Sequence, residues 1–312
     1  MSRNYGIGSR DMSRAGCMLL DRMSHEGKCS FATAPAYKSG WRSFSEEAKD
    51  FGIKRMEHIT RAFVVSYGKS LAADVRNGVL KASTAQGYLT AVNRVMTAVR
   101  PNWKSVSSIK ECKIPQRHFV RDIAPIDRQR FETFITTTTH QRHKALYLLC
   151  REFGLRSKEA ACLDIQKALR EARKNQWIEV NKGTKGGRDR YVPITNEERQ
   201  IRALEFAKSQ LGKNDTALIP KELNLAQYKH GEMRNARVEL EEQTNATGLH
   251  ELRAAYACER YRELTGHDAP CIRQSGHREI TREEDHAARL VIAKELGHGR
   301  IDVVAAYVGS SK

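Results

Sequence analysis

The pattern of hydrophobic and polar positions along the chain changes near residue 40. Over residues 1–40, glycine, serine and arginine follow one another with little periodicity, which predicts a basic arm that is partly disordered or partly helical. Beyond it, apolar residues recur at helical spacing. Thr60 can cap a helix that ends near Asn77, and Ser83 can cap a helix that Pro101 stops. The pattern therefore predicts short helices around a small core.

A second structured region follows a linker over residues 113–124, where prolines alternate with basic residues. A helix is predicted over Phe131–Phe153. Two short β-branched and aromatic runs, Trp177–Val180 and Arg190–Pro193, flank the glycine-rich segment Lys182–Gly187 and predict a β-hairpin. The remaining pattern is helical, over residues 197–211, 227–242, 251–264 and 282–296.

The charge of the chain indicates a polyanionic partner. Of the 312 residues, 54 are Lys or Arg and 37 are Asp or Glu, so the net charge is +17. Residues 1–120 carry 20 basic and 9 acidic side chains, so this end should make the densest contact. Any one of these cations can equally be ordinary solvated surface. The candidates for phosphate contact on the predicted helices are Arg61, Lys69, Lys81, Arg94 and Arg100.

Several classes of protein are excluded by composition. The longest apolar run, Ala145–Cys150, is far shorter than the roughly twenty residues of a membrane helix. The amino-terminal residues lack the apolar core of a secretory signal, so we expect a cytoplasmic location. Seven cysteines without a CxxC pair predict neither a disulfide framework nor a standard zinc site.

The candidate reactive groups form an ordered set, although each alone has an ordinary structural explanation. The set comprises Gly154-Leu155-Arg156, Lys185 in the predicted hairpin, His250-x-x-Arg253, Leu296-Gly297-His298, and Tyr307 nine positions after that histidine. Together they resemble the signature of the tyrosine recombinases, the phage-type integrase family. The active site of that family consists of two arginines, a lysine, two histidines and a nucleophilic tyrosine. The family's lysine lies seven positions before the valine of a Val-Pro pair, which selects Lys185, with Lys182 as the alternative.

The resemblance implies a mainly α fold arranged as a two-domain clamp. Residues 41–112 would form a helical core-binding (SAM-like) DNA domain. Residues 125–312 would form a mixed α/β, mostly helical catalytic domain with a small β-hairpin.

The implied roles agree with the chemistry of cutting a phosphodiester. Tyr307 would be the nucleophile and would conserve the bond energy in a 3′-phosphotyrosyl link without ATP. A free tyrosine phenol ionises only near pH 10, so its attack requires a cationic surrounding. Arg156 and Arg253 suit bidentate contact with phosphate oxygens and would take the role of metal ions, so we expect no metal and no cofactor.

The three remaining residues would move protons. Lys185, at a flexible hairpin tip, would protonate the departing 5′ oxygen. His250 would accept or relay the tyrosine proton, and His298 would donate to a phosphate oxygen.

Two features depart from the family pattern. Between Arg253 and His298 lie 44 residues, which predicts an insertion around residues 264–284. With its flanks, this insertion contains residues that suggest zinc, although their spacing matches no standard site: Cys258, His267, Cys271, His277 and His286. Only five residues follow Tyr307, whereas many relatives continue into a helix that docks on a neighbouring subunit.

The predicted function is site-specific recombination of duplex DNA at attachment sites, in a nucleoid-associated integrase of a mobile element. We expect self-association into a tetramer on DNA, with accessory DNA-bending proteins or a directionality factor as further candidate partners, and no membrane contact. Two alternatives remain, a type IB topoisomerase-like enzyme and a catalytically silent DNA-binding regulator of the same fold. The complete six-residue set argues against the silent regulator, because a pure binder does not need Tyr307.

Overall fold

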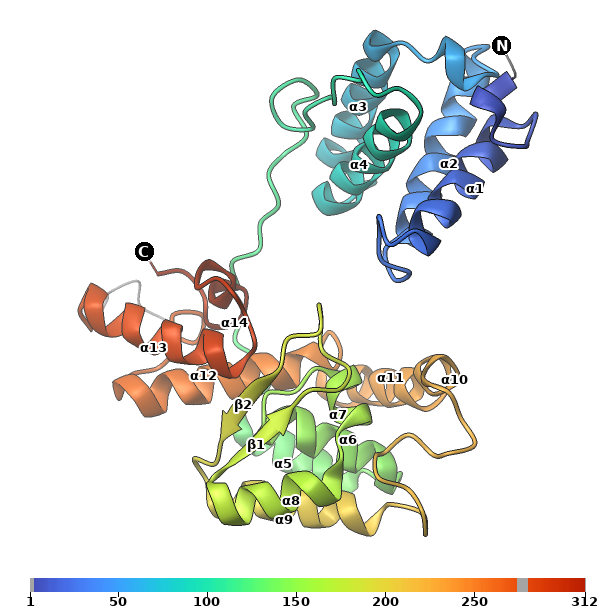
Figure 1. Cartoon of the computed structure of the whole chain (residues 1–312). Coiled ribbons are helices and arrows are strands. Elements are labelled where there is room, and N and C mark those ends of the chain that lie inside the picture. Colours follow the sequence, from blue (N-terminus) through green and yellow to red (C-terminus); the bar gives the residue numbers. More distant parts are fainter. Residues whose placement is uncertain (1–2, 274–279, 312) are drawn as a thin grey trace. The chain divides into compact units, whose positions relative to one another are not determined.

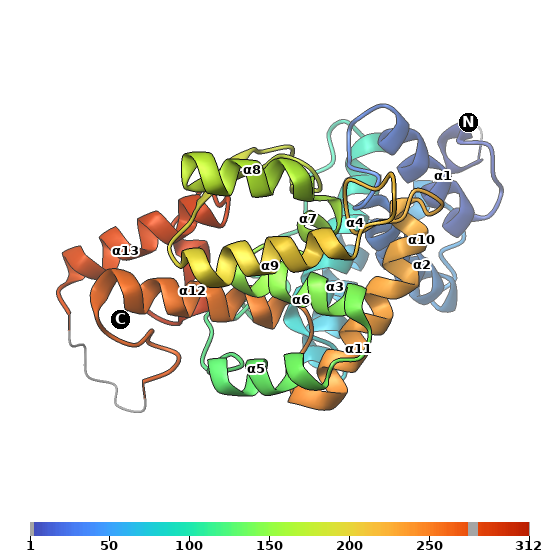
Figure 2. The same ribbon diagram turned by 90° about the horizontal axis from the view of Figure 1, so that it is seen from below.

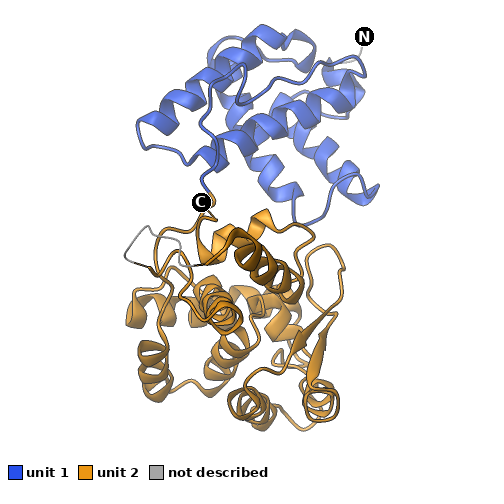
Figure 3. Cartoon of the chain, turned by 90° about the vertical axis from the view of Figure 1, so that its left-hand side faces the viewer, with its two compact units in different colours: residues 1–118 blue, residues 119–312 orange. Residues whose placement is uncertain are grey.

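The chain is mostly helical, as Figure 1 shows in one view and Figure 2 from below. The computed structural model describes residues 3–273 and 280–311. It divides into two compact units, residues 1–118 and 119–312 (Figure 3). The boundary falls inside the segment predicted as a linker. Among the described residues, no helix combines the length and apolarity that crossing a membrane would need.

Unit 1 is a small helical domain. Its helix α2 packs against both α1 and α4. The aromatic rings of Trp41, Phe44 and Tyr67 lie in the centre of the core, each with 1% exposure or less. The elements are η1 (Arg3–Gly6), α1 (Met12–His25), α2 (Ala34–Asp50), η2 (Met56–His58), α3 (Arg61–Arg76) and α4 (Ala82–Val99).

The prediction of a basic arm over residues 1–40 is wrong for most of that segment. Helix α1 begins at an Asp11 cap, and its apolar face is buried in the core of unit 1. Met12, Leu19, Leu20 and Met23 recur at the helical spacing that the sequence pattern contained, but the surrounding Gly, Ser and Arg residues obscured it. The segment is therefore part of the folded domain.

Helix boundaries in unit 1 follow local capping chemistry. The side chain of Thr60 accepts a hydrogen bond from the backbone N–H of Phe63, which confirms the predicted start of α3. Helix α4 starts earlier than predicted, because its cap position is Lys81 in an extended conformation and Ser83 lies within the first turn.

Unit 2 carries the predicted hairpin. Strands β1 (Trp177–Val180) and β2 (Arg190–Pro193) pair antiparallel, with Ile178 opposite Val192 and both side chains fully buried. Helices α8 and α9 pack together, and α9 also packs against α6 (Figure 2). The helices are α5 (Arg128–Thr137), α6 (Gln141–Glu152), α7 (Ser157–Cys162), α8 (Ile165–Asn175), α9 (Glu197–Ser209), α10 (Leu225–His230), α11 (Glu232–Thr244), α12 (His250–Thr265), α13 (Arg282–Glu295), η3 (Asp302–Val304) and α14 (Ala305–Val308).

Two predicted helices are each divided in the structure. The helix expected over residues 131–153 is α5 followed by α6, because the first ends within four consecutive threonines, residues 136–139, and His140 caps the second. The helix expected over residues 227–242 breaks at Gly231 into α10 and α11.

The expected insertion lies in the connection between α12 and α13. His277 lies outside the described residues. Among the residues that are described, no three His, Cys, Asp or Glu side chains gather in a geometry that could hold a metal ion.

The burial of α1 leads to a stability prediction. Leu20→Ala should lower the free energy of unfolding of unit 1 by roughly 2–4 kcal/mol, because it leaves a cavity in a fully buried position. Met18→Ala, on the exposed side of the same helix, is the matched control and should change it by less than about 0.5 kcal/mol. Urea unfolding followed by circular dichroism measures both. Equal, small effects would mean that α1 contributes little to the core.

Candidate active site

Five of the six predicted catalytic residues come from elements that converge in unit 2. Arg156 is the cap residue of α7, and His250 and Arg253 lie in the first turn of α12. Residues three apart on a helix share a face, so these two side chains project together. His298 follows the end of α13, and Tyr307 lies in α14. The site is therefore assembled by tertiary packing.

The hydroxyl of Tyr307 lies between a guanidinium and an imidazole. The Nε of Arg253 donates to it over 3.4 Å, and Nε2 of His298 lies 3.1 Å away. The His250 ring is also close, with its centroid 5.2 Å from that of the tyrosine ring. Tyr307 is only 3% exposed, so its hydroxyl is oriented by these partners rather than by bulk water.

Arg253 is fully buried and connects three segments of unit 2. Its terminal nitrogens donate to the backbone carbonyls of Gly154, before α7, and Leu296, after α13. Burial, with the nearby charges of Arg156 and Arg190, lowers the pKa of Arg253 to about 10. It still carries its charge at neutral pH, and a phosphate would supply a second counter-charge beside that of Glu159, which lies 3.7 Å away.

Glu159 is the buried carboxylate that holds the cations in place. It accepts hydrogen bonds from the side chain of Arg156 at 2.6 Å and from both terminal nitrogens of Arg190 at 2.7 and 3.0 Å. Arg253 approaches it at 3.7 Å. Burial acts to raise the pKa of Glu159, but the arginines outweigh it and lower the pKa to about 2. One carboxylate thus faces three guanidiniums, which leaves a net positive pocket.

Sequence analysis assigned no role to Glu159 or Arg190, although both left a signal. Glu159 stands at the third position of α7, where its carboxylate also accepts the backbone N–H of Arg156 in a capping box. Arg190 shares a strand face with the fully buried Val192, so the alternation of a strand places this charged side chain on the inner face. A charge on a buried strand face requires a buried partner.

Both histidines of the pocket are neutral at physiological pH. Loss of hydration, followed by the charges of Arg253 and Arg156, lowers the pKa of His298 to about 4. The same causes lower the pKa of His250 to about 4, although part of its ring reaches solvent. A neutral imidazole can accept a proton, which an imidazolium cannot.

Gly297 turns the chain so that His298 reaches the pocket. Its φ of +66° is in the left-handed region, and the N–H of His298 donates back to the carbonyl of Ala293. A Cβ at Gly297 would also lie 2.9 Å from the side chain of Arg190. The Leu-Gly-His motif therefore has a steric reason as well as a conformational one.

The structure does not bring Lys185 to the other five residues. It lies exposed in the connection between β1 and β2, and so does the alternative, Lys182. In the part of the chain that is described, neither lysine makes a hydrogen bond or ion pair with a pocket residue.

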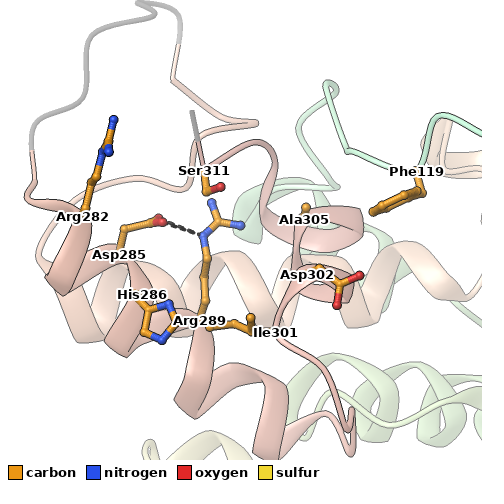
Figure 4. A pocket seen from close by; sticks show the side chains of 9 residues that line it. All are labelled: Phe119, Arg282, Asp285, His286, Arg289, Ile301, Asp302, Ala305 and Ser311. Atoms are coloured by element: carbon orange, nitrogen blue, oxygen red, sulfur yellow. Dashed lines mark hydrogen bonds and ion pairs between the residues drawn. The ribbon is translucent and has the colours of Figure 1, made fainter.

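Arg289 of α13 binds the backbone of the segment that follows Tyr307. Arg289 pairs with Asp285 at 2.9 Å and donates to the carbonyls of Gly309 and Ser310, each over 3.0 Å. Figure 4 shows this pair beside an open pocket, with Ser311 next to the guanidinium. These bonds help to hold the four-residue helix α14 in position.

The phosphate-contact candidates of unit 1 differ in their surroundings. Lys69 and Lys81 are exposed. Arg61 pairs with Glu111, and Arg94 donates to the carbonyl of Lys28. The guanidinium of Arg100 donates to the hydroxyl of Tyr5 and to the carbonyls of Met56, Glu57 and Ile59, which argues against a phosphate contact there. Arg100 is half-buried and links the amino-terminal segment to η2.

Comparison with known proteins points to one family. The sequence family described as "Integrase" matches residues 122–259. The Tn1549 transposon integrase, solved with circular intermediate DNA, is similar over 95% of this chain and 96% of that chain, with 13% identity and a TM-score of 0.59. The XerH site-specific recombinase, bound to a palindromic difH substrate, is similar over 96% of this chain and 81% of that chain, with 15% identity and a TM-score of 0.59. A lambda integrase, solved as a dimer bound to a core site, is similar over 92% of this chain and 93% of that chain, with 14% identity and a TM-score of 0.58. No curated protein sequence matches the chain.

The depressed pKa of Glu159 predicts how stability depends on pH. Its pKa is lower in the folded state than the ordinary value of 4.5, so its stabilisation is complete above about pH 4.5 and is lost as the pH falls towards 2. The difference in unfolding free energy between the native protein and Glu159→Gln should therefore shrink by about 3 kcal/mol between pH 5 and pH 2. Denaturant unfolding at several pH values measures it. Glu198→Gln, on the surface, is the control, and a constant difference for Glu159→Gln would contradict the assignment.

Proposed function

We propose that the chain is a tyrosine recombinase of the integrase family and that it cuts and rejoins duplex DNA through a 3′-phosphotyrosyl link at Tyr307. The observation that carries this assignment is the placement of the Tyr307 hydroxyl against Arg253 and His298. A nucleophile beside fixed cations is what attack on a phosphodiester requires, because negative charge develops on the non-bridging oxygens.

Each residue of the pocket has a proposed task. Arg156 and Arg253 bind the non-bridging oxygens of the scissile phosphate, with Glu159 orienting the first of them. Tyr307 attacks phosphorus, and the 5′ oxygen leaves with a proton from the hairpin lysine. In rejoining, the 5′ hydroxyl attacks the phosphotyrosine and Tyr307 departs.

The geometry favours His298 as the group that takes the tyrosine proton. We expected His250 in that role, but Nε2 of His298 is the imidazole nitrogen within hydrogen-bond distance of the Tyr307 hydroxyl. Since its pKa is about 4, His298 is available to accept that proton. His250, at the open side of the pocket, is better placed to contact the phosphate.

A basic groove beside the pocket is a path for the DNA backbone. It is lined by Lys229, His230 and Arg234, and it extends to His250 and to Ser157, next to Arg156. Lys229 and Arg234 are exposed, with no ion pair among the described residues. Cations in line with the scissile position would hold the phosphates that flank it and set the register of cutting.

The assembly and biological setting are inferred from the relatives. The similar Tn1549 protein is an integrase of a transposon, and the similar lambda integrase is a dimer on a core site. We infer that this chain is likewise a mobile-element integrase that acts on attachment sites and assembles as a tetramer on DNA. Analytical ultracentrifugation with an attachment-site duplex would measure the number of protomers.

The role of Tyr307 is tested by removing one atom. Tyr307→Phe should bind duplex DNA as the native protein does and form no covalent complex, because the attacking oxygen is absent. A nicked suicide substrate followed by denaturing electrophoresis measures the complex. Tyr256→Phe, which also loses a buried hydroxyl but lies outside the reacting group, is the control. A covalent complex with Tyr307→Phe would refute the assignment, and none with the native protein would favour the silent regulator.

The lysine that protonates the leaving 5′ oxygen can be identified by restoring the cleavage rate of its alanine variant with a modified substrate. Lys185→Ala should slow cleavage by about 10²–10⁴-fold, since the 5′ oxygen would leave without a proton. A substrate with sulfur at that position should restore the rate, because a thiolate leaves without protonation. Lys182→Ala is tested alongside, and rescue of that variant alone would transfer the role to Lys182.

The groove is tested through the salt dependence of binding. Replacing Lys229 and Arg234 together with alanine should reduce the slope of log K against log salt by roughly 2, because two phosphate contacts are lost. The matched control replaces Arg173 and Arg202, two surface arginines outside the groove. Fluorescence anisotropy at several salt concentrations measures both. Equal slopes for both double variants would remove the groove from the DNA path.

A further inference from the structure

Two cysteines lie against the backbone of the nucleophile. Cys258, in α12, and Cys271, in the segment after it, have sulfur atoms 3.6 Å apart. Each sulfur also lies within hydrogen-bond distance of the carbonyl oxygen of Tyr307, 3.4 Å from Cys258 and 3.6 Å from Cys271. The five other cysteines are unpaired thiols with no such sulfur contact among the described residues. The pair therefore stands out by position and by proximity.

We propose that Cys258 and Cys271 form a redox-modification site that takes a peroxide as oxidant, closes to a disulfide and withdraws Tyr307 from the pocket. The proposal rests on the proposed function, since its readout is cleavage by Tyr307. It concerns residues that take no part in the cleavage chemistry itself.

The step balances with one peroxide molecule. The Cys271 thiol gives up its proton, and the thiolate attacks one oxygen of hydrogen peroxide. The O–O bond breaks, a sulfenic acid forms, and the departing hydroxide takes up the thiol proton to become water. The Cys258 sulfur then attacks the sulfenic sulfur, an S–S bond forms, and a second water leaves. The two cysteines lose two electrons and two protons in total, and the peroxide oxygens are reduced. A dithiol reverses the step by thiol–disulfide exchange.

Cys271 is the better initial site of attack. It is 9% exposed, against 3% for Cys258. The hydrogen bond from Cys258 lowers the pKa of the Cys271 thiol, and the charges of Arg121 and Arg289 act in the same direction against burial. The pKa of Cys258 is raised in turn by the same hydrogen bond and by burial. Such an asymmetric pair supplies one attacking and one resolving thiol.

Closing the pair would disturb α14. The sulfurs must approach from 3.6 Å to about 2.05 Å, and both S–H groups beside the Tyr307 carbonyl are lost. The segments cannot slide freely, because the N–H of Cys271 donates to the carbonyl of Val308 over 3.0 Å. Gly309 packs so closely that a Cβ there would lie 2.7 Å from the Cys271 nitrogen. The displacement therefore passes to the helix that places Tyr307 beside Arg253 and His298.

The experiment compares cleavage and thiol pairing in the same full-length samples. The reduced protein, peroxide-treated protein and treated protein returned to dithiothreitol are each given a suicide substrate in single-turnover conditions. Peptide mass spectrometry without DNA detects a linked pair of peptides containing residues 258 and 271. Peroxide should form that link and slow cleavage at least tenfold, and dithiothreitol should restore the rate.

Cys258→Ala and Cys271→Ala, each compared with its own reduced state, should keep their rates in peroxide. Cys162→Ala, which removes a more accessible thiol of the same unit, should remain as sensitive as the native protein. Absence of the link, a link without slowing, or equal inactivation of both pair variants would overturn the proposal. Failure of the reduced native protein to cleave would instead overturn the proposed function, while the mass measurement would still decide whether the pair closes.

Discussion

The candidate active site depends on one buried carboxylate. Buried arginines that lie close together repel one another and lose hydration, so the folded state is stable only if an opposite charge lies among them. Glu159 supplies it by bonding Arg156 and Arg190 directly and by facing Arg253. Because a single negative charge faces three positive ones, the pocket is stable enough to fold and still deficient in negative charge. A phosphate removes that deficiency, so the folding requirement and the binding requirement are met by the same group.

Backbone carbonyls complete this arrangement. Arg253 donates to carbonyls before α7 and at the end of α13, and Arg190 donates to the carbonyl of Glu295 over 2.7 Å. The carbonyls of Glu295 and Leu296 lie at the carboxyl end of α13, where they have no partner within the helix, and the carbonyl of Gly154 lies in the connection between α6 and α7. The hairpin, α7, α12 and α13 are thereby fixed to one another at the site, and none of them can move without breaking a charged hydrogen bond.

Tyr307 lies in a helix that contributes little to its own stability. Helix α14 has four residues, and a helix so short is unstable without tertiary contacts. Three sets of contacts hold it. Arg289 donates to the carbonyl of Gly309, the thiols of Cys258 and Cys271 lie at the Tyr307 carbonyl, and the Tyr307 hydroxyl contacts the residues of the pocket. Placement of the reacting oxygen is therefore sensitive to small changes in these few contacts, which makes a chemical change at the thiols effective.

The sequence by itself determined the features that depend on local order. Helix α3 with its Thr60 cap, the hairpin with its strand bounds, and the residue set that resembles the family signature follow from spacing and residue type. The family resemblance supplied the expected roles of that set. The sequence analysis missed α1, because its apolar residues at helical spacing were hidden among Gly, Ser and Arg.

Only the tertiary structure decided that Glu159 and Arg190 complete the pocket and that Arg100 bonds the amino-terminal segment to η2. It also decided that His298 is the imidazole at the Tyr307 hydroxyl and that two cysteines meet at the Tyr307 carbonyl. Each of these is a contact between different elements of the fold, and the distance between two such side chains is set by packing, which no local pattern records.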